Sequence, residues 1–279
     1  MSYNPEIPKN KYDNYGDREW TRLERDGHGE LLYHVHFDVL NKYLCQNDKV
    51  LEIGAGSGRY TKDIVKMCKE LIVADISPHQ IAFNKSKMQE LLLLDKIKAF
   101  HVLDVIKMGI FEDSYFDCVV CIGGVINYLL DKEKDGIVEM LRVLRPGGKL
   151  IVGAMGFIGA SLYYLDGIRY EKDQFGLEAT KWIFDTGIQD EEHYPVPSKH
   201  YVHMMRSTEM DALFADFPVT VIERRSAGLF TQAGDVALEN ARQDKEFWEL
   251  VVKKEIEFTK LPGTLDCGMN IIYVAQKSL

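Results

Sequence analysis

The chain of 279 residues is 46% hydrophobic and 28% charged, a balance typical of a globular protein with enough apolar side chains for a sizeable core. This composition excludes a disordered chain, a collagen and a coiled coil. The net charge of −9 disfavours a nucleic-acid substrate, because lysine and arginine contacts with phosphates dominate the affinity of proteins for nucleic acids.

The N-terminal part of the chain is predicted to contain an amphipathic helix. Its apolar residues recur at helical spacing: Leu32, Val35, Val39 and Tyr43. A polar arm that carries aromatic residues precedes this helix. We assign residues 1–45 to the arm and the helix together.

Short apolar runs separated by helical segments come next. The runs cover residues 50–53, 71–74, 97–103, 118–122 and 149–152. Runs that are apolar on both faces and alternate with helices indicate a parallel sheet covered on both sides. One buried helical stripe lies before the last run: Ile137, Met140, Leu141 and Leu144. Residues 46–156 are therefore the predicted α/β core.

Residues 157–206 interrupt this alternation and are rich in aromatic side chains. We interpret them as an inserted cap on the acceptor side, while the alternative is that most of the rings only build the cap's own core. After the cap, a helix is predicted over 207–214, a strand over 219–223, a helical stretch over 235–260 and a last strand over 269–275. Residues 207–279 would complete the core and add an extra helix.

Signals for export and disulfide bonding are not expected. The N-terminal arm has no apolar run of the kind that a secretory signal needs, and the longest uncharged stretch, residues 150–165, is short for a membrane span. Five irregularly spaced cysteines suit reduced thiols and a cytoplasmic protein. Cys118 and Cys121 form a CxxC pair, but in a strand they would point to opposite faces as buried, inert thiols.

The most informative motif follows the first predicted strand and reads Val50-Leu-Glu-Ile-Gly-Ala-Gly-Ser-Gly-Arg-Tyr60. Glycines there let a ligand lie against the backbone at the carboxyl edge of the sheet. A P-loop is rejected, because it needs a lysine and a hydroxyl residue after the last glycine. A dinucleotide loop is weakened by Arg59 in place of the third glycine, but Asp75 still stands where a ribose-binding acid belongs. S-adenosylmethionine, which has an ammonium and no phosphate, is compatible with Glu52.

At this point the sequence resembles the class I S-adenosylmethionine-dependent methyltransferases, whose first motif is a strand ending in Glu or Asp and then x-Gly-x-Gly-x-Gly. Further motifs match in order: Val73-Ala-Asp-Ile-Ser-Pro78, Leu103-Asp-Val105, Phe116-Asp-Cys-Val-Val-Cys-Ile-Gly-Gly124 and Leu144-Arg-Pro-Gly-Gly-Lys-Leu150. The resemblance implies a Rossmann-like, doubly wound, mostly parallel sheet with an antiparallel last strand, plus the inserted cap. It also implies S-adenosyl-L-methionine as the cofactor.

The resemblance implies roles for the residues around the methionine portion of this cofactor. The loop would line it with Gly54, Ala55, Gly56 and Gly58. Glu52 would face the ammonium group, directly or through water, and the Gly123 carbonyl would help to hold that group. In the family's N-terminal lid, tyrosines contact the cofactor carboxylate, which makes Tyr12 and Tyr15 candidates here.

The adenosine portion would meet the ends of the second and third strands. Asp75 would accept hydrogen bonds from both ribose hydroxyls, and Ile76 would pack on the adenine. Asp104 would meet the adenine amino group, with Val105 beside the ring. The alternative interpretation is structural, with Asp75 and Asp104 as turn residues and Glu52 as a cap.

Histidines in and beside the cap are the candidates for a catalytic base. Methyl transfer from a sulfonium is an in-line displacement for which a base is optional, but an oxygen or ammonium acceptor must lose a proton at some stage. His200 and His203 are the two candidates. No zinc site is expected at His200-x-x-His203 or at His34-x-His36, because the first lacks a nearby carboxylate at helical spacing and the second faces both sides of a helix.

The sequence therefore predicts a methyltransferase that acts on a small-molecule acceptor. The segment Ile122-Gly-Gly-Val125 lacks the Asn/Asp-Pro-Pro-aromatic pattern of enzymes that methylate exocyclic amines of bases or glutamine. The acidic charge and the aromatic cap favour a partly apolar metabolite, with no membrane and no nucleic acid as partner. Two alternatives stay open, methylation of an RNA or a protein and a non-catalytic module that only binds the cofactor.

Overall fold

The computed structural model describes residues 2–15, 18–22, 25–195 and 201–279. Its centre is a seven-stranded sheet in the order β3-β2-β1-β4-β5-β9-β8. β1 to β5 run parallel, and β9 runs antiparallel to both of its neighbours, which confirms the predicted sheet. The strands are β1 (Lys49–Ile53), β2 (Glu70–Asp75), β3 (Ile97–Val102), β4 (Phe116–Cys121), β5 (Leu144–Met155), β8 (Val219–Ala227) and β9 (Asn270–Lys277).

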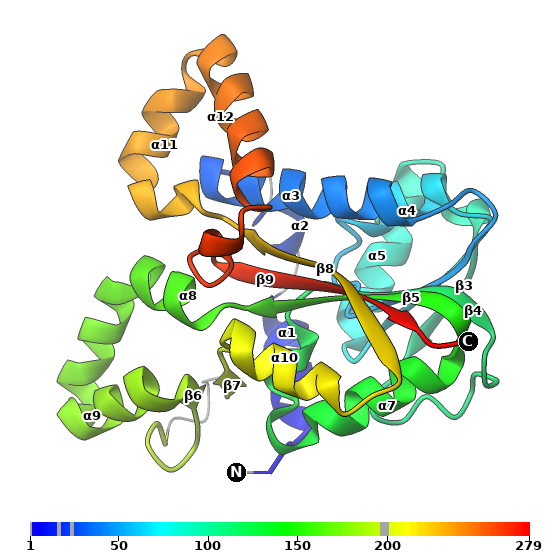
Figure 1. Cartoon of the computed structure of the whole chain (residues 1–279), viewed down its shortest axis with the longest axis horizontal. Coiled ribbons are helices and arrows are strands. Elements are labelled where there is room, and N and C mark those ends of the chain that lie inside the picture. Colours follow the sequence, from blue (N-terminus) through cyan, green and yellow to red (C-terminus); the bar gives the residue numbers. More distant parts are fainter. Residues whose placement is uncertain (1, 16–17, 23–24, 196–200) are drawn as a thin grey trace.

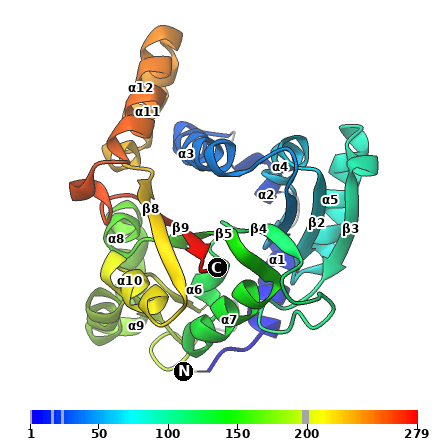
Figure 2. The same cartoon turned by 45° about the vertical axis from the view of Figure 1, so that its right-hand side comes forward.

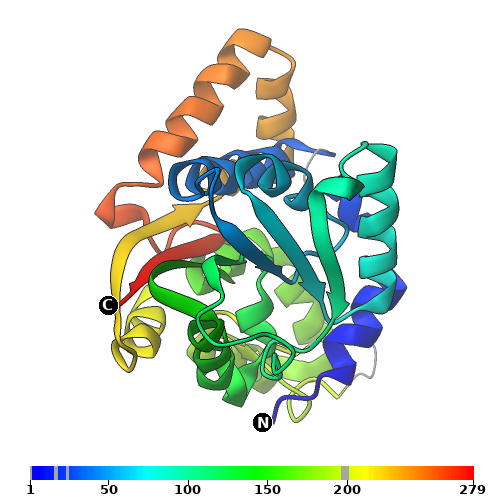
Figure 3. The same cartoon turned by 90° about the vertical axis from the view of Figure 1, so that its right-hand side faces the viewer.

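Helices cover both faces of this sheet, as Figure 1 shows. One face carries α3 (Gly27–Tyr43), α4 (Thr61–Met67) and α5 (Pro78–Glu90), and the other carries α7 (Glu133–Val143) and α10 (Ser207–Ala215). Figures 2 and 3 show the same layers from two further directions. Each layer encloses its own apolar core. The doubly wound α/β architecture therefore holds.

The CxxC pair illustrates how the two cores are separated. Cys118 and Cys121 are both fully buried in β4, and they belong to the cores on opposite faces of the sheet. Burial raises the pKa of the Cys121 thiol to about 12 and raises that of Cys118 as well. Both thiols are therefore packing groups, as the strand pattern predicts.

The N-terminal arm forms two short helices at the carboxyl edge of the sheet, α1 (Glu6–Tyr15) and α2 (Arg18–Arg22). α1 packs against α5, and Figure 3 shows the two helices side by side. The region after β5 holds α8 (Phe157–Tyr163), α9 (Leu165–Thr186) and a small ladder of β6 (Ile188–Gln189) with β7 (Val202–His203), and α6 (Val125–Tyr128) follows β4. None of the described helices is long and apolar enough to span a bilayer.

The predicted helical stretch over 235–260 is two helices rather than one. These are α11 (Asp235–Arg242) and α12 (Lys245–Phe258), which project from the sheet beside α3 (Figure 1). The break falls at Asp244, whose side chain accepts a hydrogen bond from the Phe247 amide and caps α12. Leu238 and Trp248 pack on Leu31 of α3. The pair therefore braces α3 from outside.

Candidate functional site

The glycine loop after β1 presents bare backbone at the carboxyl edge of the sheet. Gly54 and Gly56 have φ values of +67° and +51°, a region that favours glycine. A Cβ on Gly54 would lie 2.1 Å from Cγ2 of Val125, and a Cβ on Gly123 would lie 2.9 Å from the Gly54 carbonyl oxygen. The loop therefore has no room for side chains where it meets the start of α6.

Glu52 is a buried carboxylate just before this loop. Glu52 is only 2% exposed, and its Oε2 accepts a hydrogen bond of 2.6 Å from the Thr61 hydroxyl. Within the described part of the chain, no cation lies within ion-pair distance of it. Burial, with a smaller contribution from the charges of Asp75 and Asp63, raises the pKa of Glu52 to about 8. A positive group bound in the cavity would compensate this carboxylate.

Asp75 ends β2 and is held by backbone amides. Oδ2 accepts from Gly56 N at 2.8 Å, and Oδ1 accepts from Ser77 N at 2.9 Å. Ser77 in turn caps α5, with Oγ accepting from Gln80 N at 3.0 Å. Burial raises the pKa of Asp75 to about 6, since desolvation outweighs these hydrogen bonds. Each carboxylate oxygen keeps a second lone pair for a ligand donor.

The N-terminal arm closes over this edge. The Tyr3 hydroxyl donates to Asp104 Oδ1 at 3.0 Å, and Gln80 Nε2 donates to the Tyr12 carbonyl at 3.0 Å. The hydroxyls of Tyr12 and Tyr128 lie 2.9 Å apart. These contacts tie α1 and the residues before it to the ends of β2, β3 and β4.

A cavity of about 480 Å³ lies between this edge, the arm and the cap region. All but one of the residues predicted to bind the cofactor line it. They are Tyr12, Tyr15, Glu52, Gly54, Ala55, Gly56, Asp75, Ile76, Asp104, Val105 and Gly123. Parallel strands end at one edge, so motifs far apart in the chain meet around one space.

Gly58 is the exception, because it does not line the cavity. With φ +94°, it faces α5, and a Cβ there would lie 2.5 Å from Asn84 Oδ1. The absence of a side chain lets Asn84 approach, and Asn84 Nδ2 donates to Gly56 O at 3.3 Å and to Thr61 Oγ1 at 3.0 Å. The predicted role of Gly58 in lining the methionine portion is therefore corrected to one in packing the loop against α5.

The sequence profile of the methyltransferase domain family matches residues 51–152, which contain the glycine loop, Glu52, Asp75 and Asp104. Residues 51–152 of this chain are thus similar to a methyltransferase domain. The ubiquinone/menaquinone biosynthesis C-methyltransferase UbiE of Stutzerimonas stutzeri (strain A1501) is 36% identical over 112 residues, which are 38% of this chain and 41% of that protein. The match thus spans about two fifths of that relative.

Solved structures match this chain over a larger share of its length. The [4+2]-cyclase SpnF is 14% identical, with a TM-score of 0.63 over 100% of this chain and 98% of its own. Phosphoethanolamine N-methyltransferase 1 of Haemonchus contortus, in complex with phosphoethanolamine and S-adenosylhomocysteine, is 15% identical, with a TM-score of 0.59 over 98% of this chain and 48% of its own. At these identities the likeness concerns the fold.

The groups around the cavity fit S-adenosylmethionine. The buried Glu52 suits an ammonium, and the glycine backbone admits a bulky ligand that carries no phosphate. Ser57 lines the cavity, and its hydroxyl is buried with no hydrogen-bond partner among the described residues. Such an orphaned group is costly unless a ligand or a water satisfies it. Among the described residues, no cluster of His, Cys, Asp and Glu suits a metal ion.

The pKa of Glu52 leads to a prediction about cofactor binding. An ammonium beside Glu52 favours the ionised carboxylate, so binding at lower pH must first remove its proton. The affinity for S-adenosylhomocysteine should therefore rise by at least about ten-fold from pH 6 to pH 8. Glu52→Gln, which does not titrate, should flatten this rise in calorimetric titrations and leave the smaller contribution of Asp75. Equal slopes in the two proteins would contradict the assignment of Glu52.

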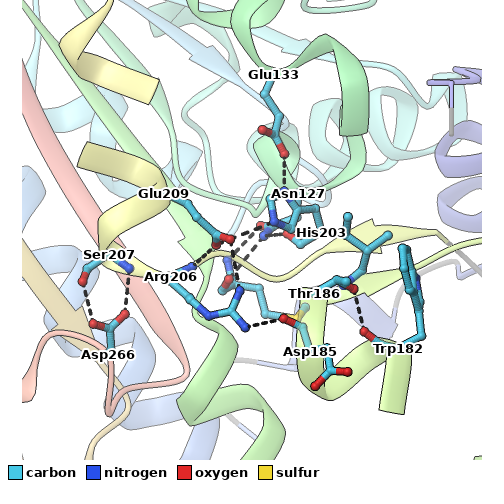
Figure 4. Close-up of polar contacts among 12 residues, drawn as sticks. Asn127, Glu133, Trp182, Asp185, Thr186, His203, Arg206, Ser207, Glu209 and Asp266 are labelled. Carbon is cyan, nitrogen blue, oxygen red and sulfur yellow. Dashed lines mark hydrogen bonds and ion pairs between the residues drawn. The ribbon is translucent and has the colours of Figure 1, made fainter. Parts of the chain in front are cut away.

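Neither of the two candidate bases is among the described residues that line the cavity. His200 lies outside the described residues. His203 does not line the cavity but stands among carboxylates, with Nδ1 at 2.7 Å from Glu133 Oε1 and Nε2 at 3.7 Å from Glu209 Oε2 (Figure 4). These carboxylates overcome burial and raise the pKa of His203 to about 9. Because His203 does not line the cavity and both of its ring nitrogens face carboxylates, the prediction of His203 as a base is corrected to a role in joining α7, β7 and α10.

This ion-pair cluster predicts how stability depends on pH. Because the pKa of His203 is raised to about 9 in the folded protein, against about 6.5 in the unfolded chain, its contribution is complete below pH 6.5 and lost as the pH rises through 9. We expect a loss of about 2–3 kcal/mol over that interval. Urea unfolding of His203→Gln should lack this loss. A decline of equal size in both proteins would refute it.

His28 and His36 line the cavity, although neither was predicted as a cofactor-binding or catalytic residue and His36 was considered only in a zinc pair. The sequence contained a signal, since His28, Leu32 and His36 are spaced by four residues, which places them on one face of a helix. That face was interpreted only through its apolar members. Lys11, also unpredicted, lines the cavity from α1, and burial lowers its pKa to about 7.

Proposed function

We propose that this protein transfers the methyl group of S-adenosylmethionine to a small, partly apolar acceptor. The observation that carries the proposal is that one cavity reaches from the glycine loop to an apolar wall. This wall is built by the cap region and α3 and contains Leu32, Ile168, Ile183, Val202 and Met204. A donor on the loop side and an acceptor on the cap side would therefore share one enclosed space.

The cofactor would be held by this chain's own groups along the strand ends. Glu52 would bind the ammonium, and the bare backbone from Gly54 to Gly56 would accommodate the methionine chain. Asp75, oriented by two backbone amides, would accept from the ribose hydroxyls. Asp104 would accept a hydrogen bond from the adenine amino group. We retain Ile76 and Val105 as the ring contacts and Tyr12 and Tyr15 as partners of the carboxylate.

The cofactor supplies a methyl group that its sulfonium already activates. The chain therefore has to position the acceptor in line with that methyl group and exclude water, and these two effects can provide much of the rate. The closed arm, tied by Tyr3 and Tyr12 to the strand ends, supports exclusion of water from the loop side.

The predicted organisation of the chain is part of this proposal. Residues 1–45 would act as lid and first helix, 46–156 as the cofactor-binding core, 157–206 as the acceptor cap, and 207–279 as the completion of the core. All five cysteines are free thiols, which supports a reducing compartment such as the cytoplasm. The charge of −9 argues for a metabolite and against a nucleic acid.

The test is incubation of the protein with S-adenosylmethionine that carries a deuterated methyl group, together with a metabolite extract. We expect a small-molecule product with the labelled methyl group, detected by mass spectrometry and absent with Gly54→Ala. Label that enters only protein or RNA would replace the small-molecule acceptor with a macromolecule. Cofactor binding without any labelled product would favour a non-catalytic module.

A further inference from the structure

One face of α3 forms part of the acceptor side of the cavity. The helix begins after Asp26, whose Oδ1 accepts from Gly29 N at 2.8 Å, and its side chains at His28, Leu32 and His36 all line the cavity. Residues four apart lie one above the other on a helix, so these three side chains form a row. The row places two imidazoles beside the apolar wall described above.

The two ring nitrogens of His36 have different surroundings. Nδ1 lies 2.7 Å from the carbonyl oxygen of Leu32, one turn earlier. A carbonyl only accepts, so Nδ1 must carry a proton. His36 is only 4% exposed. Its Nε2 is buried and has no hydrogen-bond partner among the described residues. In the neutral ring, Nε2 therefore holds an unused lone pair.

The surroundings of His36 keep this ring neutral. Burial is the main cause that lowers its pKa to about 4, and the charged groups that act on it, Arg22 of α2 and Arg225 of β8, lower it further. The Tyr60 ring packs beside it, with centroids 5.5 Å apart. His203, which faces two carboxylates, has the opposite shift. Both arginines are themselves ion-paired, Arg22 with Glu19 and Arg225 with Asp38.

The ring of His28 is less well defined than the ring of His36. Its ring stacks on the Tyr163 ring with centroids 4.2 Å apart, and its Nδ1 is buried with no hydrogen-bond partner among the described residues. No hydrogen bond fixes which of its nitrogens carries the proton. His36 alone in the row has its tautomer set by a backbone carbonyl.

We propose that His36 Nε2 accepts a hydrogen bond from a hydroxyl group of the acceptor and takes its proton during methyl transfer. This inference rests on the proposed function and narrows the acceptor to an uncharged, largely apolar molecule with a hydroxyl group, such as a phenol. An unsatisfied acceptor atom in a buried wall selects for a ligand that brings a donor.

Proton transfer to His36 accompanies methyl transfer to the acceptor. The O–H bond of the acceptor breaks and its proton moves to Nε2. The electron pair left on oxygen, or delocalised from it to a conjugated ring carbon, forms the bond to the methyl carbon. The C–S bond breaks and its pair stays on sulfur. If the ring carbon is methylated, that carbon then releases its own proton to water and the oxygen regains a proton from Nε2, so one proton is released in either case. Deprotonation of the hydroxyl is common to both outcomes.

The first test needs no acceptor. In protein labelled with 15N histidine, the ring spectrum at pH 7 should show His36 neutral, protonated on Nδ1 and unprotonated on Nε2. His36→Asn assigns the signal, because its amide can keep the hydrogen bond to the Leu32 carbonyl while it removes Nε2. A ring that is protonated on Nε2, or a cationic ring, would overturn the proposal.

The second test uses 2-naphthol and its methyl ether, 2-methoxynaphthalene, with protein saturated by S-adenosylhomocysteine. We expect 2-naphthol to bind about ten-fold more tightly than the ether, as the loss of one buried hydrogen bond implies. His36→Asn should abolish this difference, and His34→Asn, on the exposed side of α3, should keep it. Equal binding of both compounds, or binding of neither, would overturn the proposal.

Cofactor binding distinguishes a failure of the proposed function from a failure of the role of His36. Each variant is first titrated with S-adenosylhomocysteine and unfolded thermally, and both values should match the unaltered protein. If the unaltered protein fails to bind S-adenosylhomocysteine, the proposed function fails. If it binds S-adenosylhomocysteine but its selectivity for 2-naphthol does not depend on His36, only the role of His36 fails.

Discussion

Asp75→Ala is expected to weaken the binding of S-adenosylhomocysteine by about 100- to 1,000-fold, the cost of losing two charge-assisted hydrogen bonds. Asp75 lines the cavity at the end of β2, and backbone amides of Gly56 and Ser77 hold its two oxygens in place. A carboxylate fixed in this way needs little reorganisation to accept two ribose hydroxyls. Isothermal titration calorimetry measures the effect directly.

The same substitution also removes the two hydrogen bonds to the backbone, so its structural cost must be measured separately. Asp13→Ala is a useful control, because Asp13 accepts hydrogen bonds from Ser77 and His79 beside the site but does not line the cavity. It should perturb the Ser77 turn and retain most of the affinity. If Asp75→Ala binds S-adenosylhomocysteine within about two-fold of the unaltered protein, the ribose assignment is wrong.

Gly54→Ala should abolish cofactor binding almost completely and lower the free energy of unfolding by about 1–3 kcal/mol. The new Cβ would lie 2.1 Å from Cγ2 of Val125, and the residue would have to keep φ +67°. Unless the Val125 side chain moves, the loop must shift away from α6, which displaces the backbone that would hold the methionine portion. Urea unfolding and calorimetry report the two effects.

Gly234→Ala provides the matched control, because Gly234 has φ +84° and no atom within 4 Å of the added Cβ. It should cost a similar backbone strain and leave cofactor binding unchanged. The double variant Gly54→Ala with Val125→Ala removes the clashing methyl group and should recover part of the affinity. Full binding by Gly54→Ala alone would show that the loop does not contact the cofactor.

The sequence predicted the features that short segments determine. The apolar runs became the core strands within a few residues, and the α7 stripe of Ile137, Met140 and Leu141 is buried. The motif residues at strand ends converge because parallel strands place their carboxyl ends at one edge. The sequence therefore predicts the position of those site residues that come directly after a strand.

Features that depend on packing between distant segments were not predictable. Gly58 faces Asn84 of α5, a contact between residues 26 positions apart that the motif spacing does not reveal. His203 meets Glu133 of α7 and Glu209 of α10, and these carboxylates raise its pKa. His36 is a base candidate only because Leu32 fixes its tautomer and the cavity adjoins α3. Charge state at a buried site is a tertiary property.

We infer that this cavity binds S-adenosylmethionine, and a calorimetric comparison of S-adenosylhomocysteine with NAD tests that inference. The pyrophosphate of NAD would bring negative charge toward the buried Glu52, whereas the ammonium of S-adenosylhomocysteine would compensate it. We predict that S-adenosylhomocysteine binds in one site at pH 8 and that NAD neither binds nor competes. Tighter binding of NAD than of S-adenosylhomocysteine would contradict the account.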